Sequence, residues 1–365
     1  MAKTKDQPQF EFNVMMFGGK RTGKTSVLAA MKECFDNKFK NVGLTISPYD
    51  AQTIDLMKKK RSEMDGYFQR TEDYFECKDS PTLDKAKHSF KIQINDRTKG
   101  VIKLNFLDYP GEWVNSESHY KELAEEVKRA HVIIVAIDTP YLVEMPLPGD
   151  SNRIGKYNDK RNFPRKLAQL LKFNFMLGAE FPKKMVLFVP LKCEKYYHSL
   201  KMTVVNDLII SAYCEALQHL SGNNSQYCET VILPIITLGE VDFFSFKVKA
   251  DGSIDLNQSG LPTTEMYKKR DTKAKKAVPI YCEQPAAYIL MYLLDQAKES
   301  KRIKGNKVSK AIKRFFQWVQ EFTGMPTAEE FIKIREEVLK VINDEGYIHT
   351  AINDPFNYND DGGEV

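Results

Sequence analysis

The chain has 365 residues, of which 42% are hydrophobic and 28% are charged. This composition is typical of globular proteins and excludes disordered, collagen-like and membrane-embedded chains. The 54 Lys and Arg residues nearly balance the 49 Asp and Glu residues, for a net charge of +5, so bulk charge indicates neither a nucleic-acid nor a membrane partner. Because a single core usually stops growing above about 250 residues, we expect one large domain with an appendage.

Cysteine usage and the absence of long apolar runs favour a cytoplasmic protein. The six cysteines form no Cys-x-x-Cys pair and have no His at zinc-ligand spacing, so we expect reduced thiols. The apolar stretch at residues 12–17 is too short for a secretory signal. No run reaches the roughly 18 apolar residues of a membrane-spanning helix, so we expect no membrane span.

Strands and helices are predicted to alternate through residues 10–240, which favours an α/β fold with a mostly parallel sheet and helices on both faces. Two alternating segments, 89–94 and 101–107, are joined by a connector too short for a crossover helix, so they must be antiparallel. The other elements predicted from hydrophobic periodicity are, in chain order, strand 10–17, helix 25–35, helix 116–129, strand 131–138, helix 163–177, strand 185–190, helix 201–220 and strand 231–237.

Two insertions and a C-terminal helical extension are expected around this core. Apolar residues at helical intervals in the charged segment 50–79 predict one or two surface helices within an insertion near 50–85. A stretch near 139–160 that is rich in Pro, Gly and Asn predicts a loop insertion. The remaining predicted parts are a linker at 241–280 with a hairpin around Asp251-Gly252 and a basic run at 268–276, an extension at 281–352 with helices at 285–298, 307–322 and 328–343, and an acidic tail at 353–365.

A phosphate-binding loop follows the first predicted strand. Residues 18–25 match Gly-x-x-x-x-Gly-Lys-Ser/Thr, the Walker A pattern, at every fixed position. Its glycines let consecutive backbone N–H groups wrap a phosphate, Lys24 reaches the outer phosphates, and the Thr25 hydroxyl binds Mg²⁺. The predicted strand and helix on either side supply the context that this motif requires. The predicted nucleotide-binding residues of the loop are Gly18, Gly19, Lys20, Arg21, Thr22, Gly23, Lys24, Thr25 and Ser26.

A second motif, Asp108-Tyr109-Pro110-Gly111-Glu112, directly follows the predicted strand at 101–107. A carboxylate at a strand end can hold Mg²⁺ through water, which makes Asp108 a predicted metal ligand beside Thr25. Gly111 can offer its backbone N–H to a γ-phosphate, whose loss would release the loop. Glu112 can position or deprotonate the attacking water, although its charge opposes that of the γ-phosphate. The motif therefore predicts hydrolysis of a bound nucleoside triphosphate.

The phosphate loop, the Asp108 motif and the antiparallel pair before it resemble the translation-factor-related (TRAFAC) class of P-loop GTPases, over roughly residues 10–240. The resemblance implies a GTP-binding and GTP-hydrolysing molecular switch with Mg²⁺ as its cofactor. It also implies that a Thr between the first helix and the antiparallel strands binds the metal. Thr45 is our choice for this ligand, with Ser47 next.

In that class a base-reading Asn/Thr-Lys-x-Asp follows the fifth strand, and here Leu191-Lys192-Cys193-Glu194 follows strand 185–190. The partial match predicts that the stem of Lys192 lies on the purine and that Glu194 accepts hydrogen bonds from guanine. Thr237 stands where the class places a backbone contact to the guanine carbonyl. Because the first and last positions of the motif differ from the class pattern, specificity for ATP stays open.

Arg21 is predicted to assist catalysis, because its Arg-Thr-Gly-Lys context matches the guanylate-binding proteins and atlastins. In those proteins the arginine can act in cis on the phosphates once two heads meet. Arg153 or Arg161 in the inserted loop could serve the same role. As a whole, the chain is also similar to the double-GTPase group of bacterial conflict and defence systems, through the Asp108 motif and the segment 281–285. This likeness implies a protein partner or a homodimer.

The sequence thus predicts a Mg²⁺-dependent GTPase switch that regulates a protein partner, with GTP and GDP as its ligands. An ATPase of the P-loop class is the first alternative. A nucleotide-binding scaffold with little hydrolysis is the second, favoured by Glu112 where many such GTPases carry Gln. A nucleic-acid-associated factor is the third. It is not expected, because the basic run 268–276 contains Asp271 and no aromatic residue, which is typical of a solvated loop.

Overall fold

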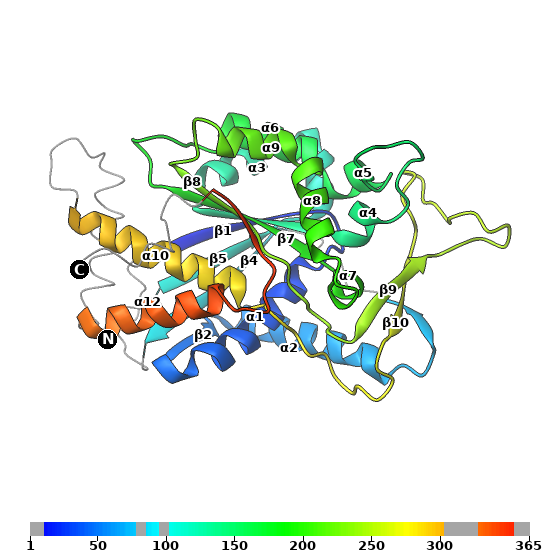
Figure 1. Cartoon of the computed structure of the whole chain (residues 1–365), viewed down its shortest axis with the longest axis horizontal. Coiled ribbons are helices and arrows are strands. Elements are labelled where there is room, and N and C mark those ends of the chain that lie inside the picture. The colour runs from blue at the N-terminus through cyan, green and yellow to red at the C-terminus, as the bar shows by residue number, and fades with distance from the viewer. Residues whose placement is uncertain (1–10, 78–84, 95–101, 303–327, 354–365) are drawn as a thin grey trace.

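An eight-stranded sheet forms the centre of the computed structural model, which describes residues 11–77, 85–94, 102–302 and 328–353 (Figure 1). The strand order is β11-β8-β7-β6-β1-β5-β4-β2. The strands of this main sheet are β1 (Glu11–Phe17), β2 (Leu44–Pro48), β4 (Ala86–Ile94), β5 (Ile102–Asp108), β6 (Val132–Asp138), β7 (Lys184–Leu191), β8 (Cys228–Ile232) and β11 (Thr350–Asn353).

The main sheet is parallel in its centre and antiparallel at its edges. Strands β5, β1, β6, β7 and β8 pair in parallel, and β4 pairs antiparallel with β5. This confirms the predicted mostly parallel sheet with its antiparallel pair. Two short edge strands that the sequence did not predict, β2 beside β4 and β11 beside β8, add further antiparallel pairings.

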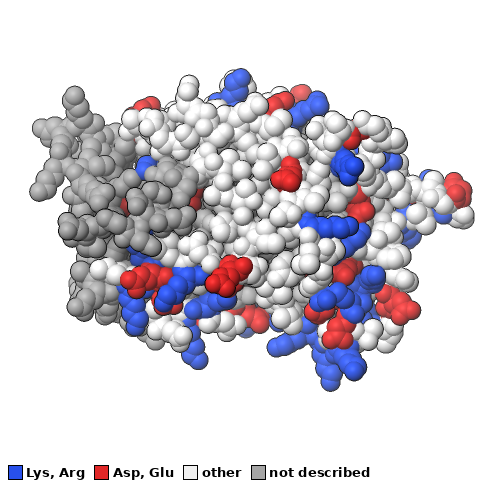
Figure 2. Space-filling model, in the orientation of Figure 1, with Lys and Arg blue, Asp and Glu red and all other residues white. Residues whose placement is uncertain are grey.

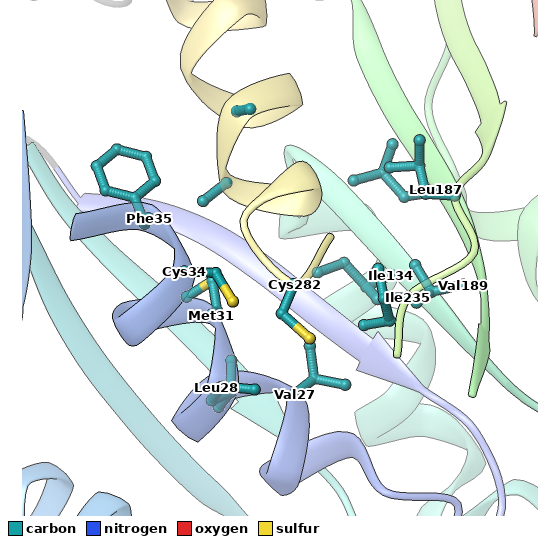
Figure 3. Close-up of a cluster of buried hydrophobic side chains, with 14 of the residues drawn as sticks. Val27, Leu28, Met31, Cys34, Phe35, Ile134, Leu187, Val189, Ile235 and Cys282 are labelled. Atoms are coloured by element: carbon teal, nitrogen blue, oxygen red, sulfur yellow. The ribbon is translucent and has the colours of Figure 1, made fainter. Parts of the chain in front are cut away.

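Helices cover both faces of the sheet, because successive residues of each strand point to opposite sides. Val14 and Met16 of β1 pack into the layer that holds α1, whereas Met15 and Phe17 pack into the layer that holds α3. Figure 3 shows the first layer, where apolar side chains of α1 face β6 and β7. The helices of the first layer are α1 (Lys24–Phe39), α2 (Ala51–Gly66), α10 (Gln284–Arg302) and α12 (Ala328–Ile342), and those of the second are α3 (Glu117–Arg129), α6 (Pro164–Asn174), α8 (Met202–Ala212) and α9 (Cys214–Ser221).

A second, three-stranded sheet, which we call the accessory sheet, joins the first predicted insertion to the predicted linker at 241–280. It consists of β3 (Tyr74–Glu76), β10 (Glu265–Lys269) and β9 (Val241–Phe246), in that spatial order. A hairpin does form around Asp251-Gly252, with Val248 opposite Ile254. However, the segment 241–280 is not a linker, because its two strands pair with each other and with β3 from the first insertion. The basic run therefore begins inside a strand.

The first insertion also contains α2 and a 3-10 turn, η2 (Tyr67–Gln69), so the predicted surface helix is present. Asp50 caps the start of α2, accepting a hydrogen bond of 2.8 Å from the Thr53 backbone N–H. The second insertion, predicted as a loop, contains the short helices α4 (Thr139–Val143) and α5 (Asn158–Asn162). Helix α5 brings this insertion against the phosphate loop, as described below.

The C-terminal helices α10 and α12 pack against each other and against α1 (Figure 1). The predicted helix at 307–322 lies outside the described residues, as does the predicted acidic tail beyond residue 353. Within the described ranges, no helix has the length and apolar character needed to cross a membrane.

Charges of both signs gather over α2 and the segment that follows β10 (Figure 2). Arg270, directly after β10, pairs with Glu240 at 2.7 Å, and Lys247, directly after β9, pairs with Glu76 of β3 at 3.1 Å. This part of the surface is therefore mixed in charge.

Candidate functional site

The phosphate loop lies between β1 and α1, at the carboxyl end of the parallel strands. Gly18 and Gly23 have positive φ angles of 152° and 104°, which glycine adopts without strain. A side chain at Gly18 would also meet the carbonyl oxygen of Ala136 on β6, because a Cβ there would lie 2.7 Å from it. The glycines predicted from the motif are thus needed for both the conformation of the loop and its contact with β6.

Lys24 lies in the first turn of α1 and is buried inside the loop. Its Nζ donates hydrogen bonds to the carbonyl oxygens of Gly18 at 3.1 Å and Gly19 at 3.0 Å, and it lies 3.7 Å from Asp108 Oδ1. Burial lowers the pKa of Lys24, against the opposing effect of the Asp108 carboxylate. Thr22 Oγ1 closes the loop further by donating to the Gly19 carbonyl at 2.7 Å.

Thr25 and Asp108 meet because β1 and β5 are parallel neighbours and the loops after them leave the same edge of the sheet. Thr25 Oγ1 donates a hydrogen bond of 2.8 Å to Asp108 Oδ2, and both residues are buried. A hydroxyl and a carboxylate are oxygen ligands of the kind that Mg²⁺ prefers, with phosphates and water completing the shell. The pair therefore fits the metal predicted from the sequence. In the part of the chain that the structure describes, no group of three or more His, Cys, Asp and Glu forms a separate metal site.

The loop after β5 lies directly on the phosphate loop. Gly111 packs against the backbone of Gly19 and Lys20 so closely that a side chain at position 111 would overlap it. Glu112, next in the chain, forms an ion pair with Lys20. Partial burial opposes ionisation of Glu112, but the hydrogen bond and charge of Lys20 lower its pKa overall. A cavity of about 740 Å³ opens beside Gly19, Gly111 and Glu112.

The structure corrects the prediction that Thr45 binds the metal. Thr45 lies on β2, and its neighbour Ile46 is in register, through β4, with Ile102. Asp108 is six residues further along β5, which at about 3.3 Å per residue is roughly 20 Å away. Thr45 and Asp108 therefore cannot share a cation here, and Ser47 on the same strand is also too distant. The prediction was wrong because the segment that carries Thr45 forms an extra edge strand, β2, and not a loop beside the nucleotide.

The predicted base-reading residues come together near the phosphate loop. Lys192, Glu194 and Thr237 line one small cavity with Thr22, Gly23 and Ser26. Glu194 is 2% exposed, and its Oε1 accepts hydrogen bonds from the backbone N–H groups of Thr237 at 3.2 Å and Leu238 at 3.0 Å. Burial raises the pKa of Glu194. In this structure Glu194 thus satisfies the backbone after β8, and it is not open to a base.

Lys192 takes part in a buried group of four charges that sequence reasoning missed. It joins Asp138 at the end of β6, Arg161 on α5 and Glu265 at the start of β10. We call this group the ion cluster. Lys192 Nζ lies 3.0 Å from Asp138 and 2.6 Å from Glu265, and Arg161 Nη2 lies 2.6 Å from Asp138 and 3.3 Å from Glu265. Burial opposes ionisation of Glu265, but the charges of Lys192 and Arg161 lower its pKa. The position of Asp138 at a strand end was the one sequence signal for the cluster.

Of the three candidate arginines, Arg161 lies against the phosphate loop. A Cβ at Gly19 would lie 2.5 Å from the Arg161 carbonyl oxygen. Its guanidinium, however, is bound to Asp138 and lies 4.6 Å from the centre of the Tyr141 ring. Arg21 and Arg153 are exposed, each in a left-handed backbone conformation with φ of 57° and 54°.

The fold and site together define a P-loop nucleoside triphosphatase fold, with the phosphate loop after β1 and an acidic motif after the neighbouring β5. No family model matches the chain, and no curated protein matches it either. Solved structures similar to it include the Arl6 BBS3 small GTPase from Trypanosoma brucei with a bound nucleotide analogue, at a TM-score of 0.32 and 11% identity, covering 63% of this chain and 90% of that one.

Two further similar structures are Roco2 RocCORdC from Methanosarcina barkeri bound to GDP and the GTPase-like domain of Ski7 from S. cerevisiae bound to GTP. The first has a TM-score of 0.31 and 12% identity and covers 97% of this chain and 76% of that one. The Ski7 domain has a TM-score of 0.30 and 14% identity, and the match covers 63% of this chain and 43% of the Ski7 chain.

Proposed function

We propose that this chain is a P-loop GTPase of the TRAFAC class, which binds GTP with Mg²⁺ and changes conformation when the γ-phosphate is hydrolysed. One observation carries the proposal. The Walker A loop and the Asp108 motif lie on adjacent parallel strands and are joined through the hydrogen bond from Thr25 to Asp108. This arrangement of hydroxyl, carboxylate and buried lysine serves phosphoryl transfer, in which catalysis is mainly positioning and charge stabilisation.

In the proposed reaction the loop amides and Lys24 bind the β- and γ-phosphates. Thr25 and Asp108 would hold Mg²⁺, which when bound supplies charge neutralisation between these phosphates. Gly111 offers its N–H to the γ-phosphate, and Glu112 accepts a hydrogen bond from the attacking water. The ion pair with Lys20 offsets the charge of Glu112. The positive charge of Lys20 therefore reduces the repulsion between the Glu112 carboxylate and the γ-phosphate.

Lys192, Glu194 and Thr237 remain the proposed contacts to the base. They are grouped beside Gly23 and Ser26 of the phosphate loop, which supports a base site at this place. The cavity that they line is only about 30 Å³, so the proposal requires that it widen when a nucleotide binds.

A second candidate is a triphosphatase that does not select guanine, including an ATPase. It is favoured by the hydrogen bonds that Glu194 makes to the backbone of Thr237 and Leu238, since these already occupy the oxygen that would read the base.

Arg21 is proposed to bind the phosphates of its own nucleotide and to assist catalysis in cis, once the chain meets a protein partner or a second copy of itself. Its side chain is exposed, which is compatible with a movement onto the phosphates. We also propose a role in a bacterial defence or conflict system, which is supported by the resemblance of the sequence to the double-GTPase group.

The test of this proposal is a titration of GTP and of ATP, each with Mg²⁺ and with excess chelator. We expect Mg²⁺-dependent binding, tighter for GTP, that Lys24→Ala abolishes and Lys32→Ala, on the outer part of α1, leaves intact. Equal affinity for ATP would replace the first candidate with the second. Binding that survives in Lys24→Ala would contradict both.

A further inference from the structure

The accessory sheet is attached to the proposed nucleotide site through the ion cluster. Asp138 ends β6, Arg161 lies on α5 and Lys192 directly follows β7, whereas Glu265 comes from β10 of the accessory sheet. All four side chains are at most 15% exposed. Removing one partner of such a buried group leaves uncompensated charge, which is strongly unfavourable. Glu265 is therefore one of the points at which the accessory sheet is held near the phosphate loop, together with the hydrogen bonds from Lys160 to Ser259 and from Tyr141 to Pro262.

Residues of the accessory sheet, and of the α2 and η2 segment that precedes β3, also fill the place proposed for the base. Met64 at the end of α2, Tyr67 of η2, Cys77 after β3 and Tyr267 of β10 line the small cavity opposite Lys192. Its volume of about 30 Å³ compares with about 300–1,000 Å³ for sites that hold ligands of nucleotide size. With the accessory sheet in this position, a purine has no room between Lys192 and Tyr267.

The filling residues are connected to one another and to Glu265. The Tyr267 hydroxyl donates a hydrogen bond to Glu265. Lys269, two residues further along β10, donates to the backbone carbonyl of Arg70 at 2.5 Å, directly after η2. Strand β10 also pairs with β3. The accessory sheet, η2 and the end of α2 are thus linked to one another, and Glu265 links them to Lys192 and Arg161.

We propose that the accessory sheet, with η2 and the end of α2, is a gate on the base side of the nucleotide site, held shut by Glu265. In the closed state Glu265 binds Lys192, a proposed base contact, and Tyr67 and Tyr267 occupy the base position. In the open state Glu265 releases Lys192 and the cavity accepts the purine. This inference rests on the proposed nucleotide binding, and it adds that the chain controls its own access to nucleotide.

The first readout of the gate needs no nucleotide. Cys77 lines the closed cavity and is only partly exposed, so an increase in the rate at which a thiol reagent modifies it, relative to the parent chain, reports opening of the gate. The assay uses a chain whose exposed Cys214 has been replaced by Ser. Glu265→Gln keeps the shape of the side chain but removes its charge and replaces one of the two accepting oxygens with an NH2 group that cannot accept a hydrogen bond. We expect it to raise the Cys77 modification rate and the association rate of GTP by about tenfold each, as for a tenfold shift of the closed-to-open equilibrium. Glu240→Gln is the matched control, because Glu240 pairs with Arg270 in the same unit but outside the ion cluster.

The outcomes separate the gate from the proposed function. Faster Cys77 modification with no nucleotide binding in any variant would show that Glu265 holds the accessory sheet closed, but it would overturn the proposed function and with it the role of the gate in nucleotide entry. Weaker GTP binding in Glu265→Gln with unchanged Cys77 modification would overturn the gate, since the cluster would then only position Lys192. If Glu265→Gln does not fold, Tyr267→Phe removes one hydrogen bond to Glu265 and keeps the ring. It should accelerate both readouts in the same direction, and equal rates in Tyr267→Phe and the parent chain would also overturn the gate.

Discussion

Lys20 and Glu112 connect the phosphate loop to the loop after β5, and their ion pair bears on the proposed hydrolysis. The two side chains are partly exposed, at 40% and 51%, so the pair itself contributes little to folding stability. Its effect is on ionisation, because Lys20 lowers the pKa of Glu112 against the opposing effect of burial. A Glu112 that accepts a proton from water must be ionised to act.

Lys20→Ala is therefore expected to move the acid limb of the rate profile to higher pH. Without Lys20, the pKa of Glu112 rises toward or above its ordinary value, and a larger fraction of the chain is protonated and inactive at mildly acidic pH. The measurement is GTP hydrolysis as a function of pH, with Lys166→Ala, which lines the same cavity, as the control. An acid limb that stays in place, or moves to lower pH, would show that Glu112 is not the base.

His131 connects folding stability to pH. Its Nδ1 accepts a hydrogen bond from the Asn13 backbone N–H at 3.2 Å, and its ring stacks on Phe12 with centroids 4.6 Å apart. Burial, together with the charge of Lys184, lowers the pKa of His131 from 6.5 to about 4. The folded chain thus keeps the imidazole neutral where the unfolded chain binds a proton.

The free energy of unfolding should consequently fall as the pH drops from about 6.5 to about 4, by up to about 1.4 kcal/mol per pH unit from this residue. Above pH 6.5 the residue contributes no pH dependence, because both states are neutral. Urea unfolding of the parent chain and of His131→Gln at several pH values measures the effect. A parent chain and variant with the same slope between pH 4 and 6.5 would contradict this account.

At the scale of elements, the parts that could be predicted are those whose signals are local. The phosphate loop and the Asp108 motif are continuous segments, and the adjacent strands that carry them have clear hydrophobic periods. The accessory sheet could not be predicted, since β3 and β10 are separated by almost 190 residues in the chain and neither is long enough to stand out. The ion cluster was missed for the same reason: Glu265 and Lys192 are far apart in the chain, and only the position of β10 in the folded structure brings them together. Thr45 was misassigned because it lies on β2, an extra edge strand, and not in a loop beside the nucleotide.

Helix α2 begins at a cap that can be removed without touching the proposed site. The Asp50 side chain accepts the Thr53 N–H at 2.8 Å, and loss of such a cap typically costs about 1 kcal/mol. Asp50→Ala should increase hydrogen exchange of amides in the first turns of α2, whereas Asp55→Ala, an exposed position on the same helix, should not. Equal protection in the two variants would show that the cap does not stabilise α2.

At the scale of the whole molecule, α1 links the proposed site to the rest of the chain. Its first residues, Lys24 and Thr25, belong to the phosphate loop, and its later turns pack against α2, α10 and α12. Near its far end, Lys38 forms an ion pair of 3.2 Å with Asp344, just after α12. A nucleotide at one end of α1 is thus joined by continuous packing to both the gate and the C-terminal helices. A protein partner that binds α10 and α12 could therefore change the position of α1 and, through it, of the phosphate loop.

The central claim, that this chain hydrolyses GTP at a site built from the phosphate loop and Asp108, is tested most directly by release of inorganic phosphate from GTP. The assay compares the full chain with Asp108→Asn, each with Mg²⁺ and with chelator, over a range of chain concentrations. We predict Mg²⁺-dependent release by the parent chain and a loss of about 100-fold or more in Asp108→Asn, the order expected when a positioned charged group is removed from a phosphoryl-transfer site. No release by the parent chain at any concentration, or release that Asp108→Asn leaves unchanged, would contradict the claim.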